Sequence, residues 1–184
     1  MNYTLQKANG EYQLGQLWEL YYSAFPLSEQ KPKELLLKCS EDGTVDPLCV
    51  TDEDGRFLSL AICAKGEDVV LLDFLAVTQQ ERGKGIGGAT LKALFDYYKG
   101  RRLVLEIEST EKKDADNFVQ RIKRKAFYLK NGMTQEDYHV LLQTVEMEIL
   151  THGGKVSFDE YKAVISAVYK KETADGVILI DTGR

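Results

Sequence analysis

The stretch QQERGKGIGG, residues 79–88, gathers four of the chain's fifteen glycines and two cations into ten residues. It follows an apolar run, VVLLDFLAV at 69–77, and precedes a helical pattern from Ile86 to Tyr98. A helix N-terminus exposes unpaired backbone N–H groups and partial positive charge, and glycines let the backbone approach a ligand closely. The order of strand, glycine-rich loop and helix therefore predicts a phosphate cradle within a mixed α/β fold.

A dinucleotide-binding turn is one interpretation of this loop. Gly83, Gly85 and Gly88 satisfy the pattern GxGxxG, and Glu106 lies about where a ribose-binding acid would be expected. That fingerprint places its first glycine directly after a strand, whereas five loop residues separate Val77 from Gly83 here. The P-loop pattern also fails, because no Lys-Ser or Lys-Thr follows at the required spacing. The spacing favours another phosphate-binding role and leaves the dinucleotide turn as an alternative.

Length and apolar periodicity predict one mixed α/β domain over residues 1–184. Three adjacent strand-like runs joined by short turns predict antiparallel pairing. The tail 171–184 is either an extension or, through VILID at 177–181, an edge strand whose exposure would invite a homodimer. The expected helices cover 14–25, 33–39, 86–98, 117–130 and 158–170, and the expected strands cover 3–7, 46–52, 56–65, 69–78, 101–109, 138–142 and 144–150.

Two helices carry more detailed expectations. The helix at 117–130 is expected to turn Phe118, Ile122, Ala126 and Leu129 inward. RIKRK, residues 121–125, is expected to be a solvated helix face, with a contact of some of its residues to a phosphate as the alternative. The helix at 158–170 is expected to begin behind a capping Ser157, and His152 is expected in the turn before it.

Composition limits the partners and the location. A net charge of −5 argues against nucleic acid, whose binding depends on neutralising phosphates. Three cysteines without a CxxC pair predict reduced thiols in a cytoplasmic protein, and with only two histidines no metal-ligand spacing is present. The N-terminus lacks the apolar core of a signal peptide, and no apolar run approaches the roughly 20 residues of a membrane span.

Two motifs resemble those of the GNAT superfamily of N-acetyltransferases. The segment from Gln80 to Gly85 matches the signature Q/R-x-x-G-x-G/A, and the longer phrase LAVTQQERGKGIGGATLKAL resembles the coenzyme-A motif of that superfamily. Downstream, AFYLKNGM at 126–133 resembles its Y-x-x-x-G-F element, with Met133 where phenylalanine is commoner. The expected element order over residues 1–150 is also similar. The resemblance implies a mixed, mostly antiparallel sheet with splayed central strands, flanked by helices, and acetyl-coenzyme A as co-substrate without a metal.

The resemblance also assigns coenzyme-binding residues. The pyrophosphate would lie on the N–H groups of the loop and of the helix that follows it. The pantetheine arm would run along the backbone of the preceding strand as an added strand does, with the Val77 amide as a candidate donor to the thioester oxygen and Asn117 as a further contact. The residues implied are Leu75, Ala76, Val77, Arg82, Gly83, Lys84, Gly85, Ile86, Gly87, Gly88 and Asn117.

Acetyl transfer to an amine needs an acid and a base. The resemblance implies that Tyr128 is the general acid near the coenzyme sulfur. Three carboxylates are candidate bases: Asp73 interrupts an apolar run, and alternation places Glu106 and Glu108 on one face of a strand.

These expectations combine into an N-acetyltransferase that acts on a primary amine of a small molecule or peptide by direct attack in a ternary complex. A protein of the same shape that binds an acyl-coenzyme A as a sensor without catalysis is the alternative, and a GxGxxG dinucleotide-binding protein is a further one.

Overall fold

The computed structural model describes residues 3–169 and 171–181. Its contacts divide the chain into two compact units, of which the first comprises Met1–Lys65 and Leu72–Lys99 and the second comprises Gly66–Leu71 and Gly100–Arg184. Strand β4, Val69–Val77, contributes its first three residues to the second unit and its remainder to the first. The expectation of one domain, made from the chain length, stays a prediction.

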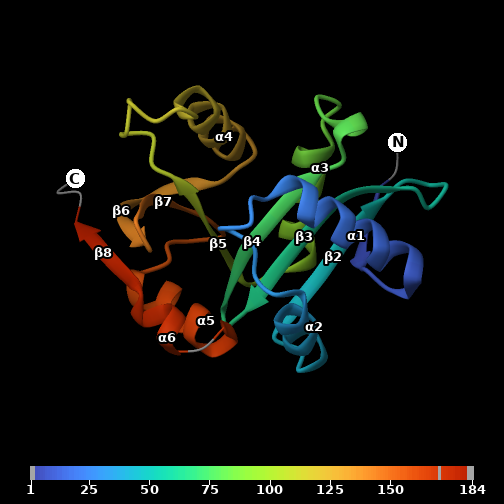
Figure 1. Cartoon of the computed structure of the whole chain (residues 1–184), viewed down its shortest axis with the longest axis horizontal. Helices are drawn as coiled ribbons and strands as arrows, with labels where there is room; N and C mark the ends of the chain where they lie inside the picture. The colour runs from blue at the N-terminus through green and yellow to red at the C-terminus, as the bar shows by residue number, and fades with distance from the viewer. Residues whose placement is uncertain (1–2, 170, 182–184) are drawn as a thin grey trace. The chain divides into compact units, whose positions relative to one another are not determined.

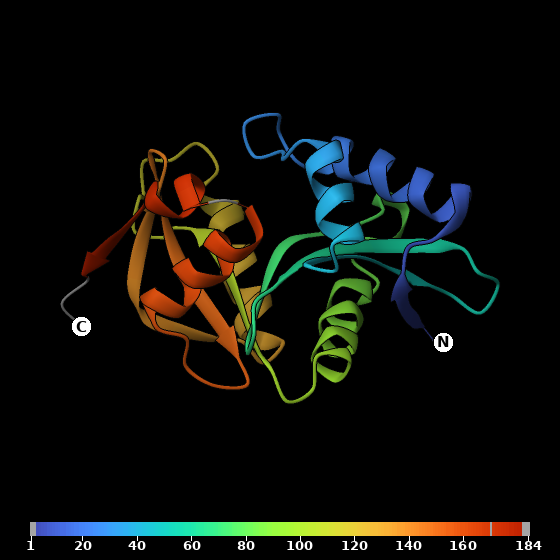
Figure 2. The ribbon, with the colours of Figure 1, turned by 90° about the horizontal axis from the view of Figure 1, so that it is seen from below.

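The first unit is a sheet with helices on both faces. Its strands follow the order β1-β2-β3-β4, with antiparallel pairing of β1 with β2 and of β2 with β3. Figure 2 shows α1 and α2, in blue, over one face of these strands and α3, in yellow-green, over the other. The elements are β1 Thr4–Lys7, α1 Gly10–Ala24, α2 Lys33–Glu41, β2 Val45–Thr51, β3 Phe57–Lys65, β4, the 3-10 turn η1 Gln79–Glu81 and α3 Ile86–Tyr97.

Helices on both faces of the sheet explain why the sequences of β2 and β3 are mostly apolar without a polar alternation. Every residue of β2 and all but the last residue of β3 are buried. Such continuous burial is typical of strands that are covered on both faces. Helix α1 begins at Gly10, before the predicted start at Leu14, because its first turn is polar and largely exposed and so carries no apolar pattern.

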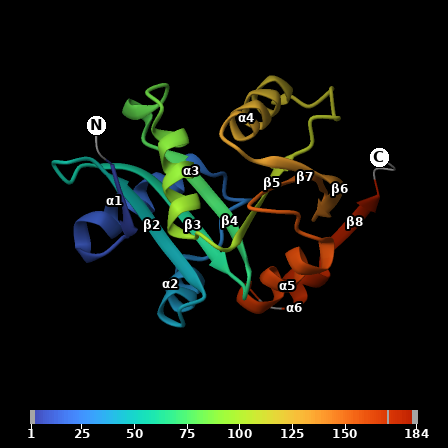
Figure 3. The same ribbon diagram turned by 180° about the vertical axis from the view of Figure 1, so that it is seen from behind.

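The second unit contains the order β4-β5-β7-β6-β8. The β4–β5 ladder is parallel and includes Val69–Leu71, whereas the other pairs are antiparallel. In Figures 1 and 3, α4 lies above β5, β6 and β7, and α5 and α6 lie below them. The elements are β5 Arg102–Glu108, α4 Phe118–Lys130, β6 Thr134–Leu142, β7 Val145–His152, α5 Phe158–Tyr169, α6 Lys171–Asp175 and β8 Val177–Asp181.

The VILID segment forms an edge strand, which is one of the two expectations for the tail. Strand β8 pairs with β6 and ends the strand order. Residues 182–184 and Lys170, the expected end of the last long helix, lie outside the described residues. Pairing of β8 with a second copy of the chain stays a prediction.

Strands β6 and β7 are longer than expected. Strand β6 starts at Thr134 because the buried carboxylate of Glu136 has local partners, accepting bonds from the Thr151 hydroxyl at 2.8 Å and the Val156 N–H at 3.0 Å. The polar run at its start therefore does not exclude a strand. The expected turn at His152 is wrong, because this residue ends β7 and pairs with Leu103 of β5.

The capping prediction for the last long helix is confirmed. The Ser157 hydroxyl accepts a hydrogen bond from the Glu160 N–H at 3.3 Å, and the Glu160 carboxylate accepts one from the Ser157 N–H at 2.9 Å. This reciprocal pair is a capping box, which satisfies two N–H groups at the start of α5.

The expected inward face of α4 is wrong. Ile122 is 44% exposed and Leu129 is 41% exposed, whereas the buried residue of this helix is Arg121. The expected solvated character of RIKRK is therefore wrong at Arg121. Hydrogen bonding to a partly buried carboxylate, described below, outweighs the apolar pattern here.

None of the helices within residues 3–169 and 171–181 combines the length and apolarity that a bilayer span requires. Cys39, Cys49 and Cys63 are buried free thiols.

Asp46 of β2 connects four elements of the first unit. Its carboxylate lies 2.8 Å from the ammonium groups of Lys7 in β1 and Lys65 in β3, and it accepts a hydrogen bond of 2.8 Å from the Tyr98 hydroxyl at the end of α3. Burial raises the pKa of Asp46, but the hydrogen bonds from Lys65, Lys7 and Tyr98 outweigh burial and lower the pKa below its ordinary 3.8. Asp46 therefore favours folding as an ionised group.

We expect Asp46→Asn to lower the free energy of unfolding at pH 7 by about 3–5 kcal/mol, because it removes the anion from a buried ion pair. Since the folded state lowers the pKa, this stabilisation is complete above the ordinary value of 3.8 and is lost as the pH falls through the folded-state value. Urea unfolding between pH 7 and pH 3 measures both effects. The exposed Asp42→Asn is the control, and equal effects of the two substitutions would contradict the assignment.

Candidate functional site

The glycine-rich loop leaves the end of β4 and opens α3. Gly83 and Gly85 have φ angles of 79° and 85°, in the left-handed region that glycine adopts at little cost. Gly85 is the N-cap of α3, and no side chain caps this helix. The first N–H groups of an α-helix lack partners within the helix. The sequence pattern thus produces an uncapped helix N-terminus that an anion can approach.

Glu81 organises this loop, and sequence reasoning missed it. Its buried carboxylate lies 3.2 Å from Lys84 Nζ and 3.2 Å from an Arg56 guanidinium nitrogen, which comes from the β2–β3 turn. Arg82 Nε donates to the Val77 carbonyl at 3.2 Å. An acid among cations in a glycine-rich loop is the signal that could have identified Glu81.

Alternation along β4 gives this strand one half-buried side near the loop. As whole residues, Asp73, Leu75 and Val77 are half-buried, although the Asp73 side chain itself is buried, and Phe74 and Ala76 between them are buried. Residues two apart lie on one face of a strand. The coenzyme residues expected from 75 to 88 thus form one continuous segment of the first unit.

The Asp73 carboxylate is held by a lysine from the segment between α1 and α2. Lys31 Nζ donates to its two oxygens at 2.7 and 2.6 Å. The Asp73 side chain is 4% exposed and that of Lys31 is 24% exposed. A charge in this apolar strand is therefore explained by an ion pair.

Glu108 and Asn117, both predicted as site residues, contact each other in the second unit. Asn117 Nδ2 donates to both Glu108 oxygens at 2.9 and 3.1 Å, and the guanidinium groups of Arg121 and Arg124 donate to them at 2.7 and 3.1 Å. Arg121 Nε also donates to Asn117 Oδ1 at 2.7 Å. These bonds connect the end of β5 to the first turns of α4. A proton transferred to Glu108 would have to displace one of the hydrogen bonds that its carboxylate oxygens already accept.

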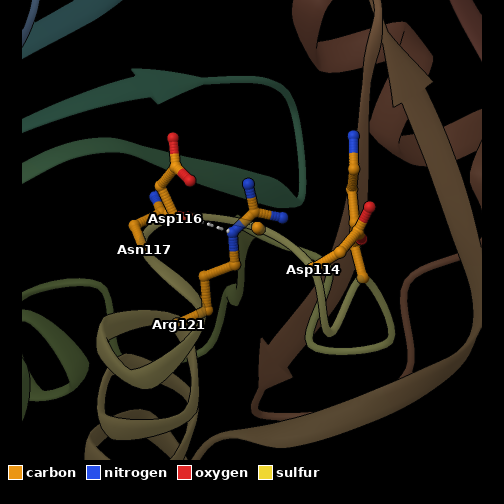
Figure 4. Close-up of a pocket in the computed structure, with 6 residues that line it drawn as sticks. Asp114, Asp116, Asn117 and Arg121 are labelled. Atoms are coloured by element: carbon orange, nitrogen blue, oxygen red, sulfur yellow. Dashed lines mark hydrogen bonds between the residues drawn. The ribbon is translucent and has the colours of Figure 1, made fainter.

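A hollow of about 560 Å³ lies beside this cluster. Figure 4 shows Asn117 and Arg121 joined by a hydrogen bond, with Asp116 next to them and Asp114 on the far side of the hollow. Its lining is mostly charged or polar, whereas small-molecule sites are predominantly apolar. The hollow therefore does not by itself identify a substrate.

Tyr128 of α4 is a half-buried phenol. Burial raises its pKa to about 12, and the charge of Glu106 acts in the same direction, while Arg124 opposes them. Its ring packs against Phe127 with centroids 5.1 Å apart. The hydroxyl therefore keeps its proton at neutral pH, as a general acid requires. The predicted common face of Glu106 and Glu108 agrees with their equal, half-buried positions in β5.

Three further side chains could together coordinate a cation. Glu111, His139 and Glu146 place one ligand atom each within 4.8 Å of one another, and His139 Nδ1 lies 2.6 Å from a Glu146 oxygen. They come from three separate segments of the second unit, which explains why no metal-ligand spacing exists in the sequence. The short contact between His139 and Glu146 already accounts for this arrangement as a hydrogen-bonded pair.

A sequence model of the acetyltransferase (GNAT) family matches residues 14–123. This match covers more than half of the chain and includes β4, the glycine-rich loop, α3 and the start of α4. No curated protein sequence matches the chain significantly.

Solved structures share the fold at low sequence identity. A candidate acetyltransferase of the GNAT family from Bacteroides thetaiotaomicron is 19% identical with a TM-score of 0.72, over 92% of this chain and 99% of that chain. Spermidine N-acetyltransferase from Vibrio cholerae, in complex with CoA and spermine, is 14% identical with a TM-score of 0.63, over 81% and 94%. The ribosomal-protein-S18-alanine N-acetyltransferase from Escherichia coli is 17% identical with a TM-score of 0.57, over 85% and 96%. The expected fold class, a mixed α/β structure with a mostly antiparallel sheet flanked by helices, is confirmed.

Proposed function

The chain belongs to the acetyltransferase (GNAT) family, and on that premise we propose that it moves the acetyl group of acetyl-coenzyme A to a primary amine of a small molecule or peptide. The amine nitrogen attacks the thioester carbon, a C–N bond forms, and the C–S bond breaks. The amine loses one proton and the departing thiolate gains one. The observation that carries this proposal is the uncapped, glycine-lined start of α3.

The coenzyme pyrophosphate is proposed to lie on the N–H groups from Arg82 to Gly88. Helix N-termini favour anions through unpaired N–H groups and the helix dipole. At both Gly83 and Gly85, an added Cβ would find no atom within 4 Å, so the backbone there is open to a ligand. The pantetheine arm is proposed to follow the backbone of Leu75–Val77 on the half-buried side of β4.

Tyr128 is proposed to protonate the departing thiolate. A pKa of about 12 keeps its hydroxyl protonated at neutral pH, so a donor is always available. For the proton of the amine, Asp73 is the proposed acceptor. Lys31, a cation paired with the Asp73 carboxylate, is partly exposed, whereas the residues that hold Glu108 also anchor α4. Asn117, which also donates to the Glu108 carboxylate, stays a proposed coenzyme contact.

A thiol-release assay with acetyl-coenzyme A tests the proposed reaction. The acceptors are polyamines, aminoglycosides, amino acids and peptide N-termini, and we expect release with at least one of these classes. Calorimetric binding of acetyl-coenzyme A without release from any acceptor would support the sensor alternative. No binding at all would overturn both, and a thermal shift with NAD in place of coenzyme A would favour the dinucleotide alternative.

Gly85→Trp should weaken acetyl-coenzyme A binding at least tenfold, because loss of one hydrogen bond to a charged phosphate costs about 1.5–3 kcal/mol. Gly43→Trp is a matched control, since Gly43 also has a left-handed φ of 77°, is exposed and has no atom within 4 Å of an added Cβ. Both variants should lose about 1–2 kcal/mol of stability from the left-handed backbone. Calorimetry should show normal coenzyme binding by Gly43→Trp, and equal weakening in both variants would contradict the cradle.

Tyr128→Phe should lower kcat by about 100-fold or more, the usual range for loss of an acid, and should leave acetyl-coenzyme A affinity unchanged. Tyr138→Phe is the control, because it removes a half-buried hydroxyl that donates to the Val156 carbonyl at 3.1 Å and should cost stability by about 1 kcal/mol without slowing turnover. The Tyr128 acid is lost only as the pH rises through about 12. A fall of wild-type kcat below pH 10 that disappears in Tyr128→Phe would contradict this.

A further inference from the structure

Arg124 of α4 lies one helical turn before Tyr128, the proposed acid. Side chains four residues apart on a helix are neighbours, so these two residues share one side of α4. Arg124 donates to a Glu108 oxygen at 3.1 Å, and this bond holds its guanidinium at the end of β5. The Arg124 side chain is 37% exposed, and Tyr128 is half-buried. A cation is therefore held on the side of the helix that carries the phenol.

The ion pairs around Glu108 leave a positive charge in excess. Arg121 and Arg124 both pair with this carboxylate, at 2.7 and 3.1 Å. Within residues 3–169 and 171–181, neither arginine pairs with a second acid. One carboxylate charge offsets one of the two guanidinium charges, so the cluster as a whole is cationic.

The two arginines are bonded differently. Arg121 is buried and donates to two further acceptors besides Glu108, so it anchors the start of α4. For Arg124, the described part of the chain provides one hydrogen bond, to Glu108, and this arginine is a turn nearer to Tyr128. Arg124 is therefore the cation that is free to act on the phenol.

The proton of Tyr128 is held tightly. Burial raises the pKa of Tyr128 to about 12, and the charge of Glu106 in β5 acts in the same direction, whereas Arg124 opposes them. A free thiol has a pKa of about 8.5, so a phenol with a pKa of about 12 is the weaker acid. Proton transfer from this phenol to a thiolate is uphill, and a nearby cation lowers the cost by favouring the phenolate.

We propose that Arg124 is a positioning residue for turnover: held by Glu108, it offsets the negative charge that the Tyr128 oxygen gains when its proton passes to the coenzyme sulfur. The inference rests on the proposed function for the role of Tyr128. The phenol O–H bond breaks, an S–H bond forms, and the phenolate regains a proton from water before the next turnover. Glu108, a predicted base, then contributes to the acid side of the reaction by fixing Arg124.

Fluorine NMR tests the effect of Arg124 on Tyr128 without acetyl-coenzyme A. The ten tyrosines are replaced by 3-fluorotyrosine, a more acidic phenol that titrates at lower pH. The Tyr128 signal is the one that disappears in Tyr128→Phe. Arg124→Gln should move the titration of this signal to higher pH, because loss of the cation disfavours the phenolate. The variant should stay folded, since Glu108 keeps its bonds from Arg121 and Asn117.

Lys130→Gln is the matched control. Lys130 is an exposed cation of the same helix, two residues beyond Tyr128, and it has no ion pair among the residues that the structure describes. Residues two apart on a helix do not face each other, so this variant should leave the Tyr128 titration in place. A titration that Arg124→Gln does not change, or that Lys130→Gln changes equally, would overturn the inference.

Kinetics test whether Arg124 acts through Tyr128. With an acceptor found by thiol release, Arg124→Gln should lower kcat roughly three- to tenfold, a part of the loss expected on removing the acid, with KM for acetyl-coenzyme A unchanged. Arg124→Lys keeps the charge and should lose less. In Tyr128→Phe, Arg124→Gln should lower kcat no further. Equal losses in both backgrounds would show a merely structural role and overturn the inference.

Two results separate this inference from the proposed function. Absence of thiol release by the wild type, together with a Tyr128 titration that depends on Arg124, would refute the proposed reaction and keep the electrostatic link between the two residues. Normal thiol release, with neither the titration nor kcat depending on Arg124, would keep the reaction and overturn the inference.

Discussion

Buried and partly buried carboxylates on strands, neutralised by cations from other elements, stabilise each of the two units from within. In the first unit, Asp46 of β2 joins β1, β3 and the end of α3 through two lysines and a phenol. In the second, Glu108 of β5 fixes the start of α4, and the fully buried Glu148 of β7 lies 2.5 Å from Lys125 of the same helix. Because an unpaired buried charge is very costly, each pair specifies which elements can be neighbours.

The same constraint shapes the candidate site. Glu81 is buried within the glycine-rich stretch, where Arg56 and Lys84 pair with it, and the left-handed Gly83 and Gly85 that follow it are exposed. Asp73 lies two residues before the proposed pantetheine path, and its carboxylate is paired with Lys31 from the segment between α1 and α2.

Sequence patterns predicted the elements well wherever one physical effect dominated. Gly85 opens α3 where expected, and Ser157 caps α5. The predictions were wrong where a tertiary partner compensated a polar residue. Apolar periodicity predicted that Ile122 lies on the buried face of α4. Instead Arg121 is buried, and it donates a hydrogen bond to Glu108. Similarly, Glu136 is polar in sequence and buried in β6, because a hydroxyl and an N–H from distant residues satisfy it.

By itself, the sequence determined the family, the order of most elements and the glycine-rich loop between β4 and α3, because these depend on local spacing: glycines that permit a left-handed backbone, an apolar strand before them and a helix after them. Only the tertiary structure decided which carboxylates are held and by what. Lys31 and Asp73 are 42 residues apart, and Glu108 and Arg121 are 13 apart. Whether a charge is buried, and which cation neutralises it, depends on distances that only the folded chain establishes.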